Sequence, residues 1–270
     1  MSFASFWKRN LAFVRLAALS NLEYRFNYLT DAILQPLLTA LIELTLWTAV
    51  FASISGDTIG GFPKSFYLSY AVWAAFVARI TANWMYEFRM IEEVDRGTIN
   101  SVLARPIGFS EYYLSQFLGY KLMTTLFSLC IPIAIELFSG SPERLLRVPA
   151  AICLTILYLV FAHLISLSIA SFAFFLNRAY SFTVAKNLLI WLLSGELFPL
   201  DLAPEPFRHW LLLLPFSSAV YVPVGYLTGR IGTDVLSAGF LHVAVGICIM
   251  WIVSSVLWKV GLRKYSGTGA

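Results

Sequence analysis

The chain has 270 residues, of which 59% are hydrophobic and only 13% are charged, and its formal net charge is +4. A mean hydropathy of +0.75 leaves too little polar surface to cover a water-soluble globule, so the composition excludes an ordinary soluble protein and predicts an integral membrane protein. No basic block interleaved with aromatic residues points to a nucleic acid partner.

The first predicted element is an amphipathic helix over residues 3–28. Its apolar residues recur at helical spacing, and Lys8, Arg9 and Arg15 lie mostly on the opposite side. Such a helix is expected to lie in the membrane interface. Because Arg15 and Glu23 interrupt the apolar run that a cleaved signal peptide needs, we expect the helix to be retained.

Six apolar segments follow, each close to the length of about 20 residues that a membrane-spanning helix needs. They cover residues 30–53, 66–86, 117–138, 149–176, 182–200 and 236–258. This pattern predicts an all-α protein with six transmembrane helices, folded as one polytopic domain over residues 1–270. An even number of spans places both termini on one side. If that side is the cytoplasm, Lys and Arg residues number eleven inside and five outside, so we expect cytoplasmic termini and a cytoplasmic tail at 259–270.

The segment 87–116 is the most polar part of the chain, and the charge count makes it cytoplasmic. A helix that continues from the second span is expected to end at Gly97, which permits a left-handed cap, and a short second helix is expected to start at Thr98. Ser110 and Glu111 are typical of the start of the third span. Because a connector between antiparallel spans needs only a few residues, we favour a docking surface over a solvated connector.

The segment 200–230 is rich in proline and lies on the outer side in this topology. Five of the eleven prolines fall between Pro199 and Pro223, around two apolar pieces that are each too short to span a membrane. Irregular backbone at membrane depth is tolerated where protein or a wet cavity satisfies it. We therefore expect a re-entrant helical hairpin in the outer leaflet rather than a surface loop.

Charged residues inside apolar segments are costly and need a partner or a wet cavity. Glu43 and Arg79 lie at similar depth in the first two spans, so we expect them to pair, either as a structural ion pair, which we favour, or on a substrate pathway. Glu196 flanks the entry to the outer hairpin. His163 and His242 have no second ligand at helical spacing, so we assign them to the core and predict no metal site.

Taken together, these pieces resemble the membrane subunit of a type-2 ABC exporter, the ABC-2-type permease family. The stretch "VDRGTINSVLARPIGFSEYYL" is similar to the family pattern of an acidic residue, a basic residue and glycine, followed by an apolar helix that ends in Leu-x-Arg-Pro. The stretch "FPLDLAPEPFRHWLLLLPFSSAVYVPVGYLTG" is similar to the family's outer hairpin. The resemblance in layout covers nearly the whole chain.

The resemblance implies a permease in the cytoplasmic (inner) membrane of a bacterium, paired with a second permease that is identical or related. It also implies two cytoplasmic ATPase subunits, which bind ATP and Mg and drive export from the cytoplasm or the inner leaflet by alternating access. The sequence has no G-x-x-x-x-G-K-[ST] phosphate loop, so we expect this chain to bind no cofactor and to be no enzyme by itself.

The resemblance also assigns roles to individual residues. The expected ATPase-coupling residues are Glu92, Glu93, Asp95, Arg96, Gly97, Ile99, Val102, Leu103, Arg105 and Arg178, with Ile99, Val102 and Leu103 packed into a cleft of the ATPase. The candidate pathway or pairing residues are Glu43, Arg79 and Glu196. The expected outer gate comprises Trp210, Leu214, Pro215 and Phe216.

Two other classes remain as alternatives: an intramembrane enzyme that modifies lipids or glycans, and an ion-coupled secondary transporter. The first would need a buried general acid and base, and the second commonly carries an inverted repeat, neither of which the sequence displays. The substrate stays open among amphipathic, lipid-like, drug-like, peptide and glycan cargo.

Overall fold

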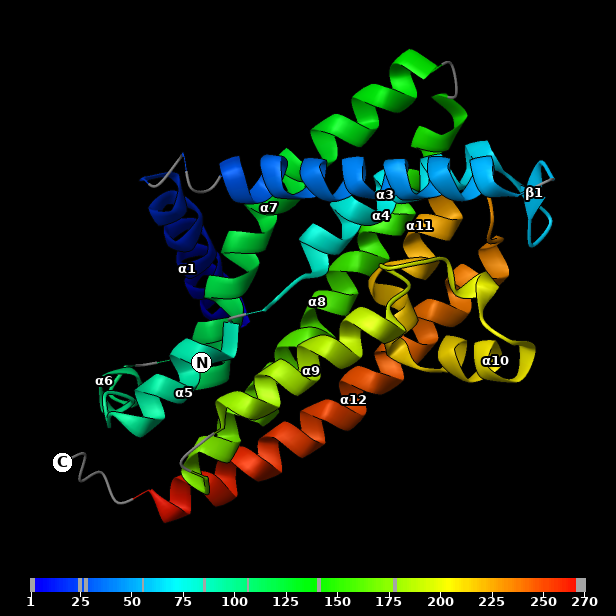
Figure 1. Ribbon diagram of the computed structural model, residues 1–270. Coiled ribbons are helices and arrows are strands. Elements are labelled where there is room, and N and C mark those ends of the chain that lie inside the picture. The colour runs from blue at the N-terminus through cyan, green and yellow to red at the C-terminus, as the bar shows by residue number, and fades with distance from the viewer. Residues whose placement is uncertain are drawn as a thin grey trace.

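The computed structural model describes residues 3–23, 26, 29–54, 56–84, 86–105, 107–139, 142–176 and 179–265, so the predicted coupling residue Arg178 lies outside the described residues. Almost all of the described chain is helical, with one short β-hairpin (Figure 1). The elements are α1 (Phe3–Glu23), η1 (Thr30–Leu34), α3 (Gln35–Ser53), β1 (Thr58–Ile59), β2 (Phe62–Pro63), α4 (Lys64–Thr81), α5 (Tyr86–Asp95), α6 (Asn100–Leu103), α7 (Phe109–Ser139), η2 (Pro142–Arg147), α8 (Val148–Ala170), η3 (Ser171–Phe174), α9 (Tyr180–Leu193), η4 (Leu200–Leu202), α10 (Glu205–Leu213), η5 (Pro215–Ala219), α11 (Tyr221–Leu227) and α12 (Thr233–Lys264).

Among the described residues, four helical segments are long and apolar enough to cross a membrane. They are Thr30–Ser53, Phe109–Phe138, Arg144–Phe174 and Thr233–Lys264. The prediction of an all-α protein with several membrane helices is therefore confirmed. The other two predicted spans correspond to α4 and α9, which have 18 and 14 residues.

Helix α8 forms the centre of the molecule. It packs against α4, α11 and α12, and 67% of its apolar window is buried, with Leu154 and Tyr158 fully enclosed. In contrast, only 17% of the windows of α3 and α12 is buried, and large apolar side chains such as Ile42 and Trp251 point outward. Exposed apolar faces around a packed centre are the arrangement expected of a protein whose solvent is lipid.

Helix α1 packs along α7, where the two backbones approach closely at Gly119. A Cβ atom at Gly119 would lie 2.6 Å from the carbonyl oxygen of Val14 and 2.7 Å from the Cβ atom of Ala17, so only glycine fits this crossing. The predicted apolar stripe is divided between two environments. Ala18 is buried, whereas Leu11 is 70% exposed.

The prediction of one continuous helix from the second span to Gly97 is wrong. Helix α4 ends at Thr81, the backbone leaves helical geometry at Ala82 (φ −58°, ψ 133°), and α5 begins at Tyr86. The intervening residues include neither Pro nor Gly, so the local sequence gives no signal for this break. The predicted fifth span is also shortened, because α9 ends at Leu193.

The molecule has two ends (Figure 1). The elbow, residues 86–105, contains α5 and α6 and lies at the elbow end. Helix α1 starts and α12 finishes at this end, because Arg9 contacts Glu111 at the start of α7 and the Tyr265 hydroxyl donates to the Gly97 carbonyl oxygen at 3.1 Å. The hairpin segment, residues 200–230, lies with β1 and β2 at the opposite, hairpin end.

Candidate functional site

The apolar side of the elbow packs onto this chain's own helices. Ile99 is fully buried and Val102 is 3% exposed, in a cluster that includes Met90 of α5 and Phe109 of α7. Phe109 in turn stacks on Trp258 of α12, with ring centroids 4.1 Å apart. The prediction that Ile99 and Val102 enter a partner's cleft is therefore wrong, because both side chains already fill the base of the elbow.

The turn between α5 and α6 has the predicted left-handed geometry at Gly97, with φ of +71°. The Gly97 amide donates to the carbonyl oxygen of Val94 at 3.2 Å, and the Ile99 amide donates to that of Glu93 at 2.9 Å. These bonds close the end of α5 and set the direction of α6. Helix α6 begins at Asn100, two residues after the predicted start.

The outward side of the elbow is charged and has one apolar residue within it. We call Glu92, Asp95, Arg96, Leu103 and Arg105 the elbow surface. Leu103 is 41% exposed, and the side chains of Arg96 and Glu92 are 72% and 45% exposed in an ion pair of 2.8 Å. Arg105 lies over the ring of Tyr112 at 5.0 Å, and partial burial raises the pKa of Asp95. The remaining predicted coupling residue of α5, Glu93, pairs with Arg89 at 3.3 Å.

The break between α4 and α5 is held by side chains from two other helices. The Lys121 ammonium of α7 donates to the carbonyl oxygen of Ala82 and, at 3.4 Å, to that of Arg79. The Asn187 amide of α9 donates to the carbonyl oxygen of Trp84 at 2.8 Å. The backbone carbonyl oxygens that lose helical hydrogen bonds at the break therefore accept hydrogen bonds from side chains. The break is thus stabilised by specific contacts in the fold.

A buried ion pair connects the start of the elbow to α9. The Lys186 ammonium of α9 contacts Glu87 of α5, which is fully buried, and also donates to the Asn83 side-chain oxygen at 3.2 Å. Asn83 donates to the Ser166 hydroxyl at 3.0 Å, and Ser166 donates to Glu87 at 3.1 Å. The pair therefore joins the elbow to α8 and α9.

His163 is a core residue, as predicted. It is fully buried on α8, its Nδ1 atom lies 2.8 Å from the Tyr86 hydroxyl, and its Nε2 atom lies 3.1 Å from the Ser110 hydroxyl. The Tyr86 hydroxyl also donates to the Tyr113 carbonyl oxygen at 2.9 Å. Within the ranges that the structure describes, no group of three or more His, Cys, Asp or Glu residues is arranged to hold a metal ion.

The predicted pairing of Glu43 with Arg79 is wrong. The Arg79 guanidinium contacts the Asp31 carboxylate in η1 and lies 3.1 Å from the Tyr120 hydroxyl. Asp31 follows the start of the first span, so its depth differs from that of Glu43 by about three helical turns. Glu43 is half-buried on α3.

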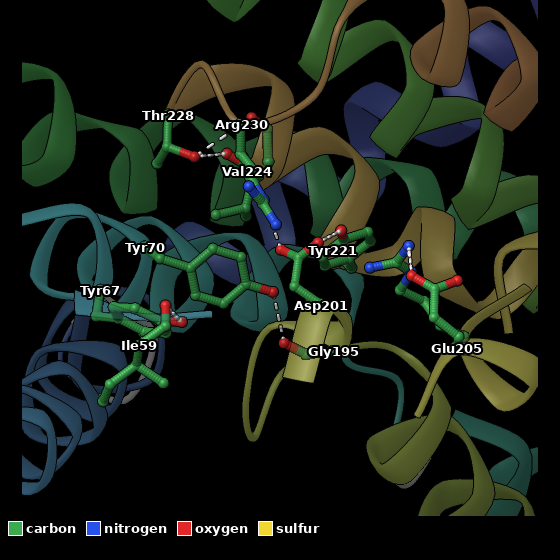
Figure 2. A network of polar contacts seen from close by, with 12 residues as sticks. Ile59, Tyr67, Tyr70, Gly195, Asp201, Glu205, Tyr221, Val224, Thr228 and Arg230 are labelled. Carbon is green, nitrogen blue, oxygen red and sulfur yellow. Dashed lines mark hydrogen bonds and ion pairs between the residues drawn. The ribbon is translucent and has the colours of Figure 1, made fainter. Parts of the chain in front are cut away.

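At the hairpin end, charged residues are paired with one another inside the fold (Figure 2). The Asp201 carboxylate accepts from Arg230 at 2.8 Å and from the Tyr221 hydroxyl at 2.7 Å. Arg230 also lies over the ring of Phe62 in β2, 3.1 Å from its centroid. The Tyr70 hydroxyl of α4 donates to the Gly195 carbonyl oxygen at 2.7 Å, next to the half-exposed Glu196.

The predicted gate residues differ in their exposure. Trp210 is 67% exposed on α10 and Leu214 is 40% exposed, whereas Pro215 and Phe216 are half-buried at the start of η5. The Phe216 ring lies 5.8 Å from that of Phe161 on α8.

Sequence reasoning missed several residues of these networks, among them Asp31, Asn83, Glu87, Lys121 and Lys186. The two lysines were visible as cations inside apolar segments, which signals buried partners. Glu87 was assigned to the polar segment 87–116, and no buried partner was predicted for it.

Comparison with known families identifies the fold that carries these features. The model of the ABC-2 family of transporter proteins matches residues 37–269. No curated protein matches the chain significantly. The family consists of permeases of ABC transporters, which associate with ABC ATPase partners, and it agrees with the several apolar helices. Because the match covers most of the chain, this protein belongs to the ABC-2 family of transporter proteins.

Proposed function

We propose that the chain is the permease subunit of an ATP-driven exporter, with the elbow as the docking site for a cytoplasmic ATPase. The observation that carries the proposal is the elbow surface: Leu103 is exposed among Asp95, Arg96 and Arg105, on a segment whose other side is packed into the membrane domain. An apolar residue within mixed charges suits a specific polar partner.

Contacts between the elbow and the membrane helices can pass a displacement of the elbow to those helices. Phe109 connects the elbow core to Trp258 of α12, and the Glu87–Lys186 pair connects α5 to α9. Because packed interfaces move as discrete bodies, a displacement of α5 and α6 is expected to be passed to these helices. Closure of the ATPases on ATP would thus change the arrangement of the spans.

The proposed assembly contains two ATPase subunits and a second permease, identical or related, in the cytoplasmic membrane of a bacterium. The chain itself has no phosphate loop, so ATP and Mg bind to the partner and this subunit is not an enzyme. Trp210, Leu214, Pro215 and Phe216 are proposed to close the outward exit. Glu43 and Glu196 remain candidates for the pathway.

Six membrane crossings are proposed, with α4 and α9 as the two short ones. At a rise of about 1.5 Å per residue, the 18 residues of α4 extend about 27 Å, close to the hydrocarbon thickness of about 30 Å. The 14 residues of α9 extend only about 21 Å, and the loop up to η4 completes this crossing. Both termini and the elbow are placed in the cytoplasm.

Docking is tested by Leu103→Asp, which places a charge without a partner in the proposed interface. Leu103 and Leu214 are 41% and 40% exposed, so Leu214→Asp is a matched control at the hairpin end. We expect the parental chain and Leu214→Asp to co-purify with a P-loop ATPase, and Leu103→Asp to lose at least about tenfold in association. Failure of the parental chain to retain an ATPase, or equal retention by both variants, contradicts the proposal.

The orientation is tested by labelling a cysteine at position 100, because Asn100 is exposed on α6. The exposed Cys130, Cys153 and Cys248 must first be replaced, since each would react as well. In intact cells, a reagent that cannot cross the membrane should label this cysteine only after the cells are opened. Labelling from outside would reverse the topology.

A further inference from the structure

A cavity of about 670 Å³ opens beside the break between α4 and α5. Its walls come from η1 and α3, from the end of α4, from the residues of the break and from α7. The ends of α3 and α4 that line it are those nearest the elbow, so in the proposed topology the cavity lies at the depth of the inner leaflet. Trp84, which is 50% exposed, stands at its edge.

The charged lining of the cavity is cationic on balance. Arg79 and Lys121 contribute two positive charges and Asp31 contributes one negative charge. Arg79 uses one terminal nitrogen for both Asp31 and Tyr120, and its buried Nε atom has no hydrogen-bond partner among the described residues. An uncompensated cation at this depth favours an anion beside it.

Most of the remaining lining is aromatic, and Gln35, Ala82 and Asn83 complete it. Phe117, Tyr120 and Tyr86 flank the cavity together with Trp84, and they offer flat apolar surface next to the cations. Helix α3, which forms one wall, has little of its surface buried, so the cavity lies next to the lipid. A cationic centre, aromatic walls and proximity to lipid match an amphiphile with an anionic head.

We propose that this cavity binds the anionic headgroup of an amphiphile from the inner leaflet, with its phosphate or carboxylate on Arg79 and Lys121 and its hydrocarbon chain leaving past Trp84. The inference rests on the proposed function: it names an anionic amphiphile as the substrate class of the exporter. The Asp31 carboxylate pairs with Arg79 in this structure, and the headgroup takes its place.

The position of Lys121 gives headgroup binding a mechanical consequence. The ammonium that lines the cavity also donates to the carbonyl oxygen of Ala82, which fixes the break above the elbow. An anion in the cavity competes with that carbonyl for Lys121. Occupancy is thus expected to change the angle between α4 and α5, and through it the elbow.

The test measures lipid selectivity directly, on the full-length permease without ATPase. The protein is reconstituted with equal amounts of phosphatidylglycerol and phosphatidylcholine, extracted, and the retained lipids are counted by native mass spectrometry. The parental chain is expected to retain phosphatidylglycerol preferentially. Arg79→Gln should reduce this preference about tenfold, since a charge-assisted hydrogen bond is lost, and Asp31→Asn should keep or increase it.

Two further variants show whether a lost preference comes from misfolding or from a nonspecific effect of charge. The double variant Asp31→Asn with Arg79→Gln removes both charges together, so it avoids an unpaired carboxylate, and it should also lose the preference. Arg144→Gln is the control, because Arg144 also pairs with a carboxylate, Glu136 at 3.2 Å, beside a smaller cavity of about 230 Å³ far from the elbow. It should retain the preference.

Competition with a soluble anion shows whether the cavity binds the phosphate of a lipid headgroup or a free phosphate compound. Glycerol phosphate at millimolar concentration should not displace phosphatidylglycerol, because it lacks the hydrocarbon chain. Displacement would assign the site to a soluble anion and overturn the amphiphile. Equal lipid selectivity in the parental chain, Arg79→Gln and the double variant would overturn the site itself.

Association with the ATPase, measured on the same variants, keeps the two proposals apart. Lipid selectivity without ATPase association would support a headgroup site in the cavity, but it would contradict the exporter and with it the assignment of the lipid as the exported substrate. ATPase association without lipid selectivity would contradict only the cavity's role.

Discussion

The two ends of the molecule use their charged side chains differently. At the hairpin end, Asp201 is buried between Arg230 and Tyr221, so the charges there bind parts of one chain together. At the elbow end, Arg96 and Glu92 pair with each other across one turn of α5 and remain largely exposed. Below them, the Glu87–Lys186 pair is almost fully buried.

This difference separates structural charges from charges available to a partner. Exposed pairs one helical turn apart contribute little to folding, so their retention on a membrane protein with few charges has to be explained by another role. Buried pairs cannot accept a partner without unfolding. An exposed pair, Glu205–Arg208, also lies at the hairpin end, so the exposed pair alone does not distinguish the two ends. The elbow surface differs in lying on a segment whose other side packs onto α7 and α12, and this position points to it as the site of charged recognition.

The largest effect on stability is expected at the buried Glu87–Lys186 pair. Lys186→Met leaves the Glu87 carboxylate buried without its cation and should destabilise the permease by about 3–5 kcal/mol. The double variant Glu87→Leu with Lys186→Met removes both charges and should recover most of this loss. Thermal unfolding of the purified chain measures both. Additive losses would mean that the two side chains do not act as a pair.

The contrast between Gly97 and Arg79 explains what sequence reasoning can reach. The turn at Gly97 was predictable because a glycine in a polar gap between two apolar stripes has a local conformational reason. The partner of Arg79 was not predictable, since depth along a span does not fix the direction in which a side chain points. The Arg79 side chain contacts Asp31, near the start of the first predicted span, rather than Glu43.

The break between α4 and α5 was hidden for a similar reason. Its residues carry no breaker, and the bonds that stabilise it come from Lys121 and Asn187, which are 39 and 103 residues distant from their partners in the chain. Likewise, Ile99, Val102 and Leu103 share apolar character, and only packing against α5, α7 and α8 decides that the first two are buried and the third is exposed.

A smaller effect is expected at the hairpin end. Asp201→Asn removes the charge that pairs with Arg230 and should cost about 1.5–3 kcal/mol of stability, since the partly buried guanidinium stays charged and loses its carboxylate partner. Glu205→Gln is the control, because its pair with Arg208 is exposed and should contribute almost nothing. Thermal unfolding compares them, and ATPase association should be unchanged in both. Loss of association in Asp201→Asn at full stability would break the distinction between the ends.

The turn at Gly97 is expected to matter by about 1–2 kcal/mol, because any side chain is strained at its φ of +71°. Gly97→Ala should lower stability by this amount, whereas Gly108→Ala in the same region should be nearly neutral. Gly108 has no positive φ, and a Cβ atom there would come no closer than 3.8 Å to its neighbours. Equal unfolding temperatures for both variants would show that the angle between α5 and α6 is not held by the glycine.

The smallest effect on stability is expected for Arg96→Ala. This variant also tests most directly whether the two ends differ in recognition of the ATPase. The Arg96 side chain is 72% exposed, so the unfolding free energy should change by less than about 0.5 kcal/mol. ATPase association should nevertheless slow at low salt, and its dependence on salt should weaken, because exposed interfacial charges act mainly through long-range attraction. Arg208→Ala is the matched control: Arg208 also pairs with a carboxylate on its own helix, at the hairpin end. If both variants slow association equally, the attraction comes from the net charge of the protein alone. The elbow surface would then not be a specific docking site for the ATPase.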